Sequence, residues 1–345
     1  MAASNGDYEI VAVFRGASLA RTLLIRENGT LKVRKEAVLQ ESSYAFQKLQ
    51  EQAAWLEAHQ RFSPRIPKLL GKKLQGDFFS YDMEYYKSMS LFDYVHVKPL
   101  ERAKEMLSQI IGFCFDGIYG GAAGKKGDNA GLLKKFVSSK LYGKIDETLK
   151  ADDRLKQIAA FDTIFVNQAE FLNFKQIAGK ITEDKETMAS LALSPVMDIH
   201  GDVCADNIIC TEAADNGSGE DGFVLLDPNP DNIFNTPLVD MSKLSQSFHS
   251  GYEFLIDSND CSVFGNQIIF NDNTSRNYVL LDGFLQAKLK ERLGEEQAAN
   301  TLFFDAINYA RMLPLKQKLT PKTYLLYYAV LVKLLNEFAQ KKGLV

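Results

Sequence analysis

Two neighbouring stretches decide the fold: HGDVCADNIIC at residues 200–210, and FVLLD at residues 223–227. Two short apolar runs joined by a polar loop predict a β-hairpin. Asn207 begins the first run and Asp227 closes the second, so one end of this hairpin should gather both side chains near Asp202. Two carboxylates and an amide at one place can position a hydroxyl group and hold Mg²⁺ against phosphate oxygens.

The N-terminal residues predict an antiparallel sheet. Residues 8–38 are rich in β-forming residues, and Asn28-Gly29 is a strong hairpin-turn signal. On the strand that follows this turn, Lys35 shares one face with two apolar residues. Because lysine is rarely buried without a partner, Lys35 should be paired with an acidic residue.

A helix is predicted over residues 41–59, because apolar residues recur there at helical spacing. These residues are Ala45, Leu49, Ala53 and Leu56. Glu51 on this helix is the expected partner of Lys35, and Glu41 is the alternative.

The remaining pattern divides the chain into a strand-rich part and a helical part. Residues 78–86 predict a strand that runs into a connector. Helices are predicted over residues 100–115, 132–149, 155–174, 279–293, 295–313 and 323–339. The expected fold class is therefore α+β with two lobes: a small β-rich lobe over residues 1–86, and a larger helical lobe over residues 87–345 that carries the hairpin.

Composition and charge argue against some classes of function. The chain of 345 residues has a net charge of −4, with 46% hydrophobic and 24% charged residues, values typical of a globular protein. A non-specific nucleic-acid or membrane-surface binder would need a basic face, so neither partner is expected. The N-terminus lacks the basic region and apolar core of a signal peptide, and no apolar run approaches the roughly 20 residues that span a bilayer.

The cysteines indicate no metal site and no disulfide framework. They are Cys114, Cys204, Cys210 and Cys261, and none forms a C-x-x-C pair. His200 lies near Cys204 and Cys210 in the sequence, but a fourth ligand for structural zinc is not evident. A reduced protein with a cytoplasmic location is expected.

The polar set suits phosphoryl transfer, which needs positioning and charge neutralisation more than covalent chemistry. Asp202 is the candidate that orients the attacking hydroxyl and accepts its proton. Asp227 and Asn207 can supply oxygen ligands to Mg²⁺, which keeps several waters and needs only one or two carboxylates. Lys35 is the candidate cation for the nucleotide phosphates, and Glu51 would fix it in place.

These residues resemble the motifs of the protein-kinase-like superfamily and, within it, of the aminoglycoside phosphotransferase and choline kinase family. That family's catalytic loop has the form H-G-D-x-x-x-x-N, which stands here at residues 200–207. Its second acidic motif is similar to LLDP at residues 225–228. Lys35 and Glu51 match the lysine of the third strand and the glutamate of the next helix. In its order of elements the resemblance covers residues 8–340.

The resemblance implies a kinase that uses ATP and Mg²⁺. Asp202 would be the catalytic base, Asn207 and Asp227 would bind Mg²⁺, and Lys35, held by Glu51, would contact the phosphates. The segment 1–86 would be the nucleotide-binding lobe, and the segment 87–345 would carry the catalytic loop and the substrate pocket.

Further nucleotide contacts follow from the same resemblance. Glu84, Tyr85 and Tyr86 would form the connector whose backbone meets the adenine. The turn with Gly16 and Ser18 would cover the phosphates, although its single glycine departs from the full G-x-G-x-x-G pattern.

The acceptor is expected to be a hydroxyl group of a small molecule such as a sugar, an amino alcohol or an aminoglycoside. Twelve residues separate Asp227 from Asp240, which leaves no room for the long activation segment that protein kinases place in this interval. Asp240 should cap the following helix or brace the catalytic loop. The polar, irregular residues 253–277 are either a substrate-side insertion or a solvated loop.

Two other classes of function stay open. One is a non-catalytic nucleotide-binding regulator on a kinase-like fold, which would usually lack one of the motif residues. The other is a protein kinase. His200 is expected to support the loop structurally through hydrogen bonds, not to shuttle protons.

Overall fold

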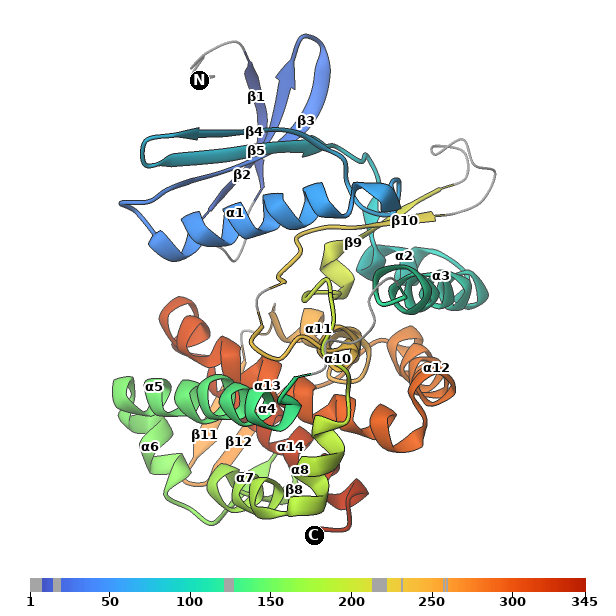
Figure 1. Cartoon of the computed structure of the whole chain (residues 1–345). Helices are drawn as coiled ribbons and strands as arrows, with labels where there is room; N and C mark the ends of the chain where they lie inside the picture. The colour runs from blue at the N-terminus through green and yellow to red at the C-terminus, as the bar shows by residue number, and fades with distance from the viewer. Residues whose placement is uncertain are drawn as a thin grey trace. The chain divides into compact units, whose positions relative to one another are not determined.

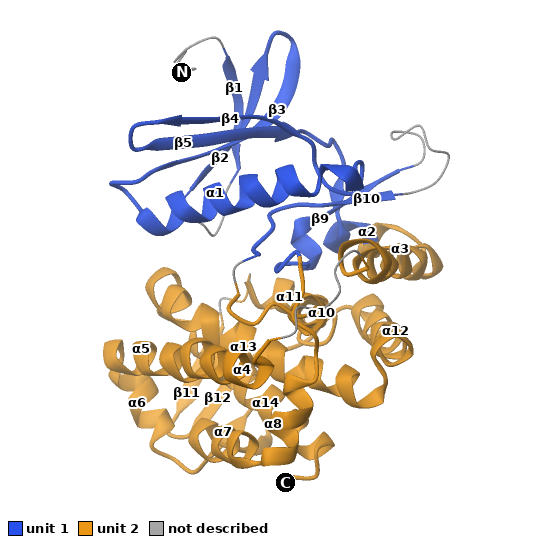
Figure 2. Ribbon diagram, viewed as in Figure 1, with its two compact units in different colours: residues 1–94, 200–231 blue, residues 95–199, 232–345 orange. Residues whose placement is uncertain are grey.

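The computed structural model describes residues 8–14, 20–120, 127–212, 222–230, 232–256, 258 and 260–345. Contacts divide the chain into two compact units (Figure 2): residues 1–94 with 200–231, and residues 95–199 with 232–345. The first unit is rich in antiparallel strands and the second is larger and mostly helical, so the predicted α+β class is confirmed.

A five-stranded antiparallel sheet forms most of the first unit (Figure 1), in the order β1-β2-β3-β5-β4. Its strands are β1 Glu9–Phe14, β2 Arg21–Glu27, β3 Thr30–Val38, β4 Leu69–Gln75 and β5 Phe78–Glu84. The predicted turn at Asn28-Gly29 joins β2 to β3, and both residues adopt positive φ, 50° and 79°. This is the backbone geometry that an Asn-Gly hairpin turn requires.

Helix α1, Ser43–Ala58, packs against β3 and β5. Ser42 caps its N-terminus, because the Ser42 side chain accepts a hydrogen bond from the Ala45 N–H at 3.1 Å. The four predicted apolar positions are all buried, together with Phe46, Gln52 and Trp55. The helical spacing in the sequence therefore identified the face that covers the sheet, and a 3₁₀ turn at Gln60–Phe62 follows the helix.

The predicted hairpin is present in the first unit. Strands β9 Ile208–Thr211 and β10 Gly222–Leu225 pair antiparallel, and β9 also pairs with the short strand β6, Met89–Ser90. The Leu225 N–H bonds to the Arg65 carbonyl at 2.9 Å, so the segment after α1 also holds the hairpin. Because of these contacts, residues 200–231 belong to the first unit. The sequence pattern instead predicts a single division of the chain, between residues 86 and 87. The boundary between the units falls inside α2, Leu91–Val97.

The second unit is built mainly of helices. They are α3 Leu100–Gly112, α4 Asn129–Phe136, α5 Gly143–Ala151, α6 Asp153–Ala159, α7 Phe174–Glu183, α8 Lys185–Ala192, α10 Pro237–Phe248, α11 Tyr252–Ile256, α12 Arg276–Leu293, α13 Glu295–Leu319 and α14 Leu325–Lys341. The π-helical turns Phe113–Ile118 and Val137–Tyr142 continue α3 and α4. Helix α13 packs against α10, α12 and α14, and it continues through Pro314, although the helix was predicted to end at residue 313.

A four-stranded sheet in this unit corrects two predictions. Its order is β11-β12-β7-β8, with β7 Thr163–Val166, β8 Ala169–Leu172, β11 Cys261–Phe264 and β12 Gln267–Phe270. The helix predicted over 155–174 is present only up to Ala159, in α6, because β-branched residues and the positive φ of Asn167, 55°, make a hairpin beyond it. The segment 253–277 is also not irregular throughout, since β11 and β12 form a second hairpin inside it.

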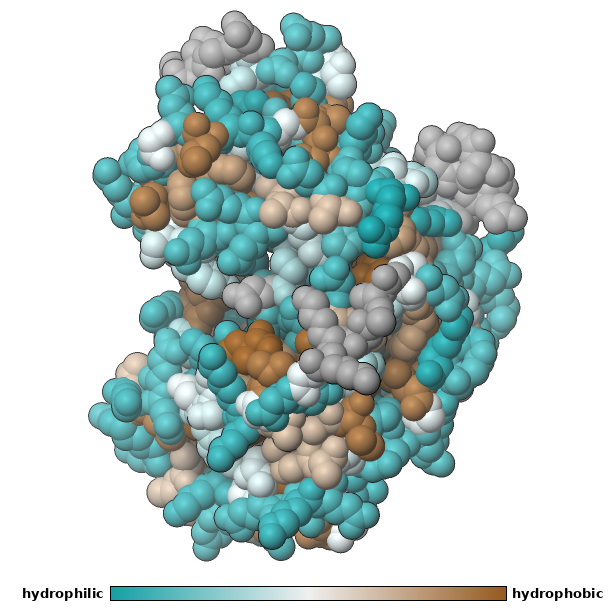
Figure 3. Space-filling model, viewed as in Figure 1, coloured by the Kyte–Doolittle hydropathy of each residue, from teal (hydrophilic) through white to brown (hydrophobic). Residues whose placement is uncertain are grey.

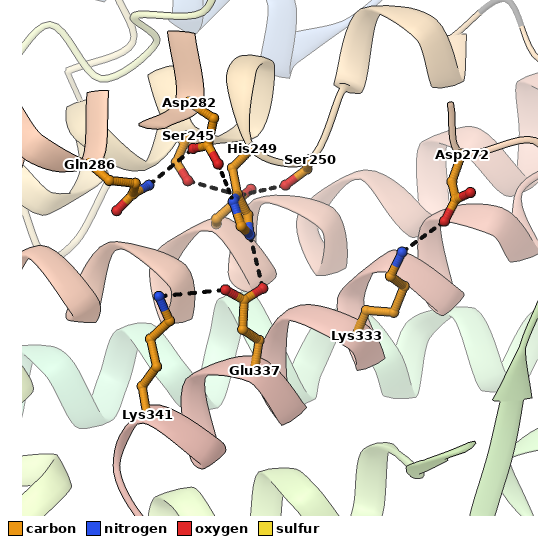
Figure 4. Close-up of polar contacts among 10 residues, drawn as sticks. Ser245, His249, Ser250, Asp272, Asp282, Gln286, Lys333, Glu337 and Lys341 are labelled. Atoms are coloured by element: carbon orange, nitrogen blue, oxygen red, sulfur yellow. Dashed lines mark hydrogen bonds and ion pairs between the residues drawn. The ribbon is translucent and has the colours of Figure 1, made fainter. Parts of the chain in front are cut away.

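A polar cluster lies among the helices of this unit (Figure 4). The His249 ring bonds to Asp282 on α12 through Nδ1 at 3.0 Å, and to Glu337 on α14 through Nε2 at 2.9 Å. These two carboxylates hold the pKa of His249 at about 10, although burial acts in the opposite direction. His249 is therefore positively charged at neutral pH and joins the C-terminal end of α10 to two other helices.

The surface is mostly hydrophilic on the face that Figure 3 shows, with hydrophobic residues in small groups. Isolated apolar side chains are normal on protein surfaces. Within the described ranges, we find no helix with the length and apolar character needed to cross a membrane.

Candidate functional site

The end of the β9–β10 hairpin brings Asn207 and Asp227 together. Ile208 pairs with Leu225 at the end of the ladder, and the Leu226 N–H donates to the Asn207 carbonyl at 2.8 Å. Asn207 closes a 3₁₀ turn just before β9, while Asp227 follows Leu226 directly. The register therefore places the two predicted metal ligands at the same end of the hairpin.

Asp202 belongs to the same backbone arrangement. The Asn207 side chain donates through Nδ2 to the Asp202 carbonyl at 3.0 Å. Gly201 just before it has a φ of 85°, which glycine adopts without strain. The Asp202 N–H faces His200 Nδ1 at 3.4 Å, and the Asn229 N–H donates to the His200 carbonyl at 2.7 Å. The loop at 200–207 is thus tied to the segment that carries Asp227.

Asp227 has an unusual backbone conformation. Its φ is 59°, in the left-handed region that few residues other than glycine adopt. Aspartate tolerates this region better than most residues, and such conformations concentrate at functional sites. Among the described residues, Asn28, Asn167 and Ile233 also have a positive φ, so this geometry supports the candidate site only together with the contacts of Asp227.

Lys35 forms an ion pair with the Asp227 carboxylate, through Oδ1. The Lys35 side chain is 7% exposed and that of Asp227 36% exposed, so the cation is buried while the carboxylate still reaches solvent. Burial of Lys35 on β3 agrees with the prediction that it shares a face with apolar residues.

The expected ion pair between Lys35 and Glu51 is not formed: among the described residues, Lys35 is paired with Asp227 instead. Glu51 lies on the exposed side of α1, and its neighbour Gln52 takes the buried position. One residue along a helix turns a side chain by about 100°, so the two cannot share a face. The role of Glu51 in nucleotide binding stays a prediction.

Sequence reasoning missed two buried residues beside Lys35. Tyr81 on β5 lies opposite Lys35 in the strand register, and its hydroxyl donates to Gln52 Oε1 at 3.1 Å. Burial and, to a smaller extent, the charge of Asp227 raise the pKa of Tyr81 well above its usual value. The signal in the sequence was Gln52, which lies at helical spacing from Leu49 and Leu56 and therefore on the apolar face of α1, one position from Glu51.

His200 is completely buried and packs edge-on against Trp55, with ring centroids 5.3 Å apart. Trp55 in turn stacks on His59 at 3.9 Å. Burial lowers the pKa of His200 to about 4, although the charges of Asp202 and Asp227 act in the opposite direction. His200 is therefore neutral at neutral pH, which agrees with the structural role expected for it.

The proposed adenine connector begins where β5 ends. The Glu84 carboxylate accepts hydrogen bonds from the Tyr86 hydroxyl at 2.7 Å and from the Lys68 N–H at 3.4 Å. Burial and this contact raise the pKa of Tyr86. Tyr85 lies between them and is half-buried. Gly16 and Ser18, the predicted phosphate-covering turn, lie outside the described residues.

The donor set at the hairpin end suits a hard cation such as Mg²⁺. Because Asn207 Nδ2 is bound to the Asp202 carbonyl, the amide oxygen is the atom of this side chain that can coordinate. Asp227 has a second carboxylate oxygen besides the one paired with Lys35. Within the described part of the chain, no three His, Cys, Asp or Glu side chains cluster as a metal site, but Mg²⁺ needs only one or two carboxylates beside waters and phosphate oxygens.

Two acidic residues considered from the sequence lie in the second unit. Asp240 does not cap α10, because Thr236 does so by accepting from the Leu238 N–H at 3.0 Å. Asp240 is instead buried and accepts a hydrogen bond from the Tyr119 hydroxyl at 2.8 Å. Asp272, from the suggested substrate-side segment, pairs with Lys333 at 2.9 Å.

Comparison with protein-family models gives no match for this chain, and comparison with curated proteins finds no similar sequence.

Proposed function

We propose that this protein is an ATP-dependent phosphotransferase with a two-lobed, protein-kinase-like fold, and that it moves the γ-phosphoryl group to a hydroxyl of a small molecule. The observation that carries the proposal is the convergence of Lys35 and Asn207 on Asp227. Lys35 on β3 forms an ion pair with Asp227, and the hairpin register places Asn207 at the same end of the hairpin as Asp227. A buried cation, a carboxylate and an amide oxygen are the groups that a magnesium nucleotide needs.

In this proposal each residue of the candidate site has a separate role. Asp227 and Asn207 hold Mg²⁺, which neutralises charge on the nucleotide phosphates when it is bound. Lys35 contacts the phosphates, and its present partner Asp227 keeps the buried ammonium neutralised until they arrive. Asp202 orients the acceptor hydroxyl and takes its proton. His200 supports the loop in its neutral form. Because burial lowers its pKa, it places no positive charge beside Asp202.

The length of the segment after Asp227 favours a small acceptor. Helix α10 begins at Pro237, so only the residues 228–236 lie between the metal-binding aspartate and the next helix. An activation segment that recognises a peptide needs a longer loop. A sugar, an amino alcohol or an aminoglycoside is the acceptor class that this proposal names.

The test incubates the protein with ATP, Mg²⁺ and a metabolite extract, and mass spectrometry then searches for small molecules that have gained a phosphate. We expect at least one phosphorylated product, and we expect Asp202→Ala to lower its rate by about 10²-fold or more, the range for loss of a general base. Asp206→Asn, an exposed carboxylate in the same loop, is the matched control and should keep activity. Full activity of Asp202→Ala would contradict the proposal.

Two outcomes would favour the other classes of function. Nucleotide binding without phosphate transfer to any acceptor would support a non-catalytic regulator. Phosphorylated protein without a phosphorylated metabolite would support a protein kinase.

A further inference from the structure

A pocket of about 720 Å³ lies in the second unit, among α6, β11 and the turn before α14. Its volume is within the range of sites that hold small organic ligands. Its lining includes the cations Arg154 and Lys322, the exposed apolar residues Phe161 and Val263, and the buried residues Ile158 and Leu325. None of these residues belongs to the phosphotransferase site proposed above, so the pocket is a separate feature.

Arg154 is held in a fixed orientation at this pocket. Its Nε and Nη2 bond to the Asp152 carboxylate at 3.2 and 2.7 Å, and Nη2 also donates to the Pro321 carbonyl at 2.7 Å. The guanidinium lies over the Tyr324 ring, 5.5 Å from its centroid. These contacts use Nε and both N–H groups of Nη2, and Nη1 is the donor that they leave for a ligand. An arginine fixed in advance loses little conformational freedom when it binds an anion.

Lys322 supplies a positive charge that this network does not compensate. It is exposed, and the structure records no ion pair for it within the described ranges. Arg154 and Asp152 cancel each other, so the pocket mouth carries a net charge of about one positive unit from Lys322. A single carboxylate matches this charge better than a phosphate dianion, and the exposed side chains of Phe161 and Val263 offer contact to an apolar body.

We propose that this pocket binds an amphipathic monocarboxylate, with its carboxylate between Arg154 and Lys322 and its apolar part against the walls of α6, β11 and α14. The proposal does not depend on the phosphotransferase function. Its ligand chemistry is that of a medium-chain fatty acid or of another apolar carboxylic acid.

Cys261 offers a direct readout of occupancy. It lines the pocket and is partly exposed, whereas Cys114, Cys204 and Cys210 are buried. Burial raises the pKa of Cys261 to about 11, so alkylation is slow and easily followed at alkaline pH. A ligand in the pocket should therefore protect one identifiable thiol.

The experiment follows alkylation of Cys261 by iodoacetamide in the full chain, by mass spectrometry, with sodium decanoate below its micelle-forming concentration. We expect saturable protection by decanoate and much weaker protection by decanol and by decylamine. Lys322→Met should raise the half-protecting decanoate concentration about tenfold, as expected for one charge-assisted contact. Lys175→Met, an exposed lysine on α7, is the matched control and should leave that concentration unchanged.

A second variant tests the site without removing charge. Ala160 lines the pocket and is exposed, so Ala160→Trp should fill the space without disturbing the core, and it should abolish protection by decanoate. No saturable protection, or equal protection by decanoate and decanol, would overturn the proposal. Protection that persists in Ala160→Trp would overturn it as well, because decanoate would then act elsewhere.

Discussion

At the scale of single residues, a buried ammonium meets a half-exposed carboxylate at the centre of the candidate site. Lys35 is almost completely buried and Asp227 has left-handed backbone geometry. We interpret both as features held for ligand binding, since burial of a lysine and strain in an aspartate each cost free energy.

Lys35→Met should weaken ATP binding about tenfold or more, because a charge-assisted contact to phosphate contributes roughly 1.5–3 kcal/mol. Calorimetric titration with ATP and Mg²⁺ measures this change. Lys32→Met is the matched control: Lys32 lies on the other face of β3, where it pairs with Glu27. Equal losses in both variants would show that Lys35 has no specific role.

His200 should titrate in the folded protein near pH 4, as burial dictates, and NMR of the imidazole carbons measures this pKa. Its folded pKa is lower than its unfolded value of 6.5, so the unfolded state takes up the proton first. The contribution of His200 to stability is complete above pH 6.5 and is lost as the pH falls to about 4. The loss is roughly 3 kcal/mol at 1.36 kcal/mol per pKa unit. A folded-state pKa at or above 6.5 would contradict this account.

The spacing of residues in the sequence predicts which residues of the candidate site lie close together. Lys35, Asn207 and Asp227 follow from strand alternation and from the hairpin pattern. The apolar spacing of α1 places Gln52, and not Glu51, on the face that meets the sheet. It does not indicate that Asp227 is the partner of Lys35, because these two residues lie 192 positions apart in the sequence.

At the scale of elements, α1 is the helix that sets the packing behind Lys35. Its N-cap is Ser42, and the capping hydrogen bond to Ala45 satisfies an N–H that has no partner within the helix. The position of this helix therefore depends on local sequence as well as on its apolar face.

Ser42→Ala should lower the free energy of unfolding of the protein by about 1 kcal/mol, the usual cost of removing a serine N-cap. Urea denaturation followed by circular dichroism measures it. Ser43→Ala changes the next, exposed residue inside the helix and should have almost no effect. A larger loss for Ser43→Ala than for Ser42→Ala would show that the cap is elsewhere.

The elements also show that hydrophobic periodicity alone does not always distinguish a helix from strands. The apolar spacing of α1 matches its buried face over several turns. In residues 155–174, the same spacing also fits two short strands, and Asn167 without a following glycine gave only a weak turn signal. The β-branched residues of Thr163–Val166 were the signal that could have identified the hairpin.

At the scale of the whole molecule, each of the two units has its own set of internal contacts. In the second unit, His249 on the turn after α10 joins α12 and α14 through two carboxylates (Figure 4). The sequence predicted the division into a β-rich and a helical part from composition along the chain. It could not predict that residues 200–231 group with the N-terminal strands, because β6–β9 pairing and the Arg65 contact join segments far apart in the chain.

His249 should make the second unit less stable at alkaline pH. Its folded pKa of about 10 lies above its unfolded value of 6.5, so its contribution is complete below pH 6.5 and is lost as the pH rises through about 10. Denaturation midpoints measured between neutral pH and pH 10 should fall less in His249→Gln than in the unaltered protein. Asp272→Asn removes an exposed ion pair with Lys333 and is the control, with an expected change of about 1 kcal/mol or less. Parallel midpoint curves for His249→Gln and the unaltered protein would contradict the prediction.

The central claim is that the first unit carries a magnesium-nucleotide site built on Lys35, Asn207 and Asp227. The most direct measurement is calorimetric titration of ATP into the full chain, with Mg²⁺ and with EDTA, for the unaltered protein and for Asp227→Asn. This measurement needs no knowledge of the acceptor. The account predicts saturable ATP binding that requires Mg²⁺ and that Asp227→Asn weakens about tenfold or more. Absence of ATP binding, or binding that neither EDTA nor Asp227→Asn alters, would contradict it.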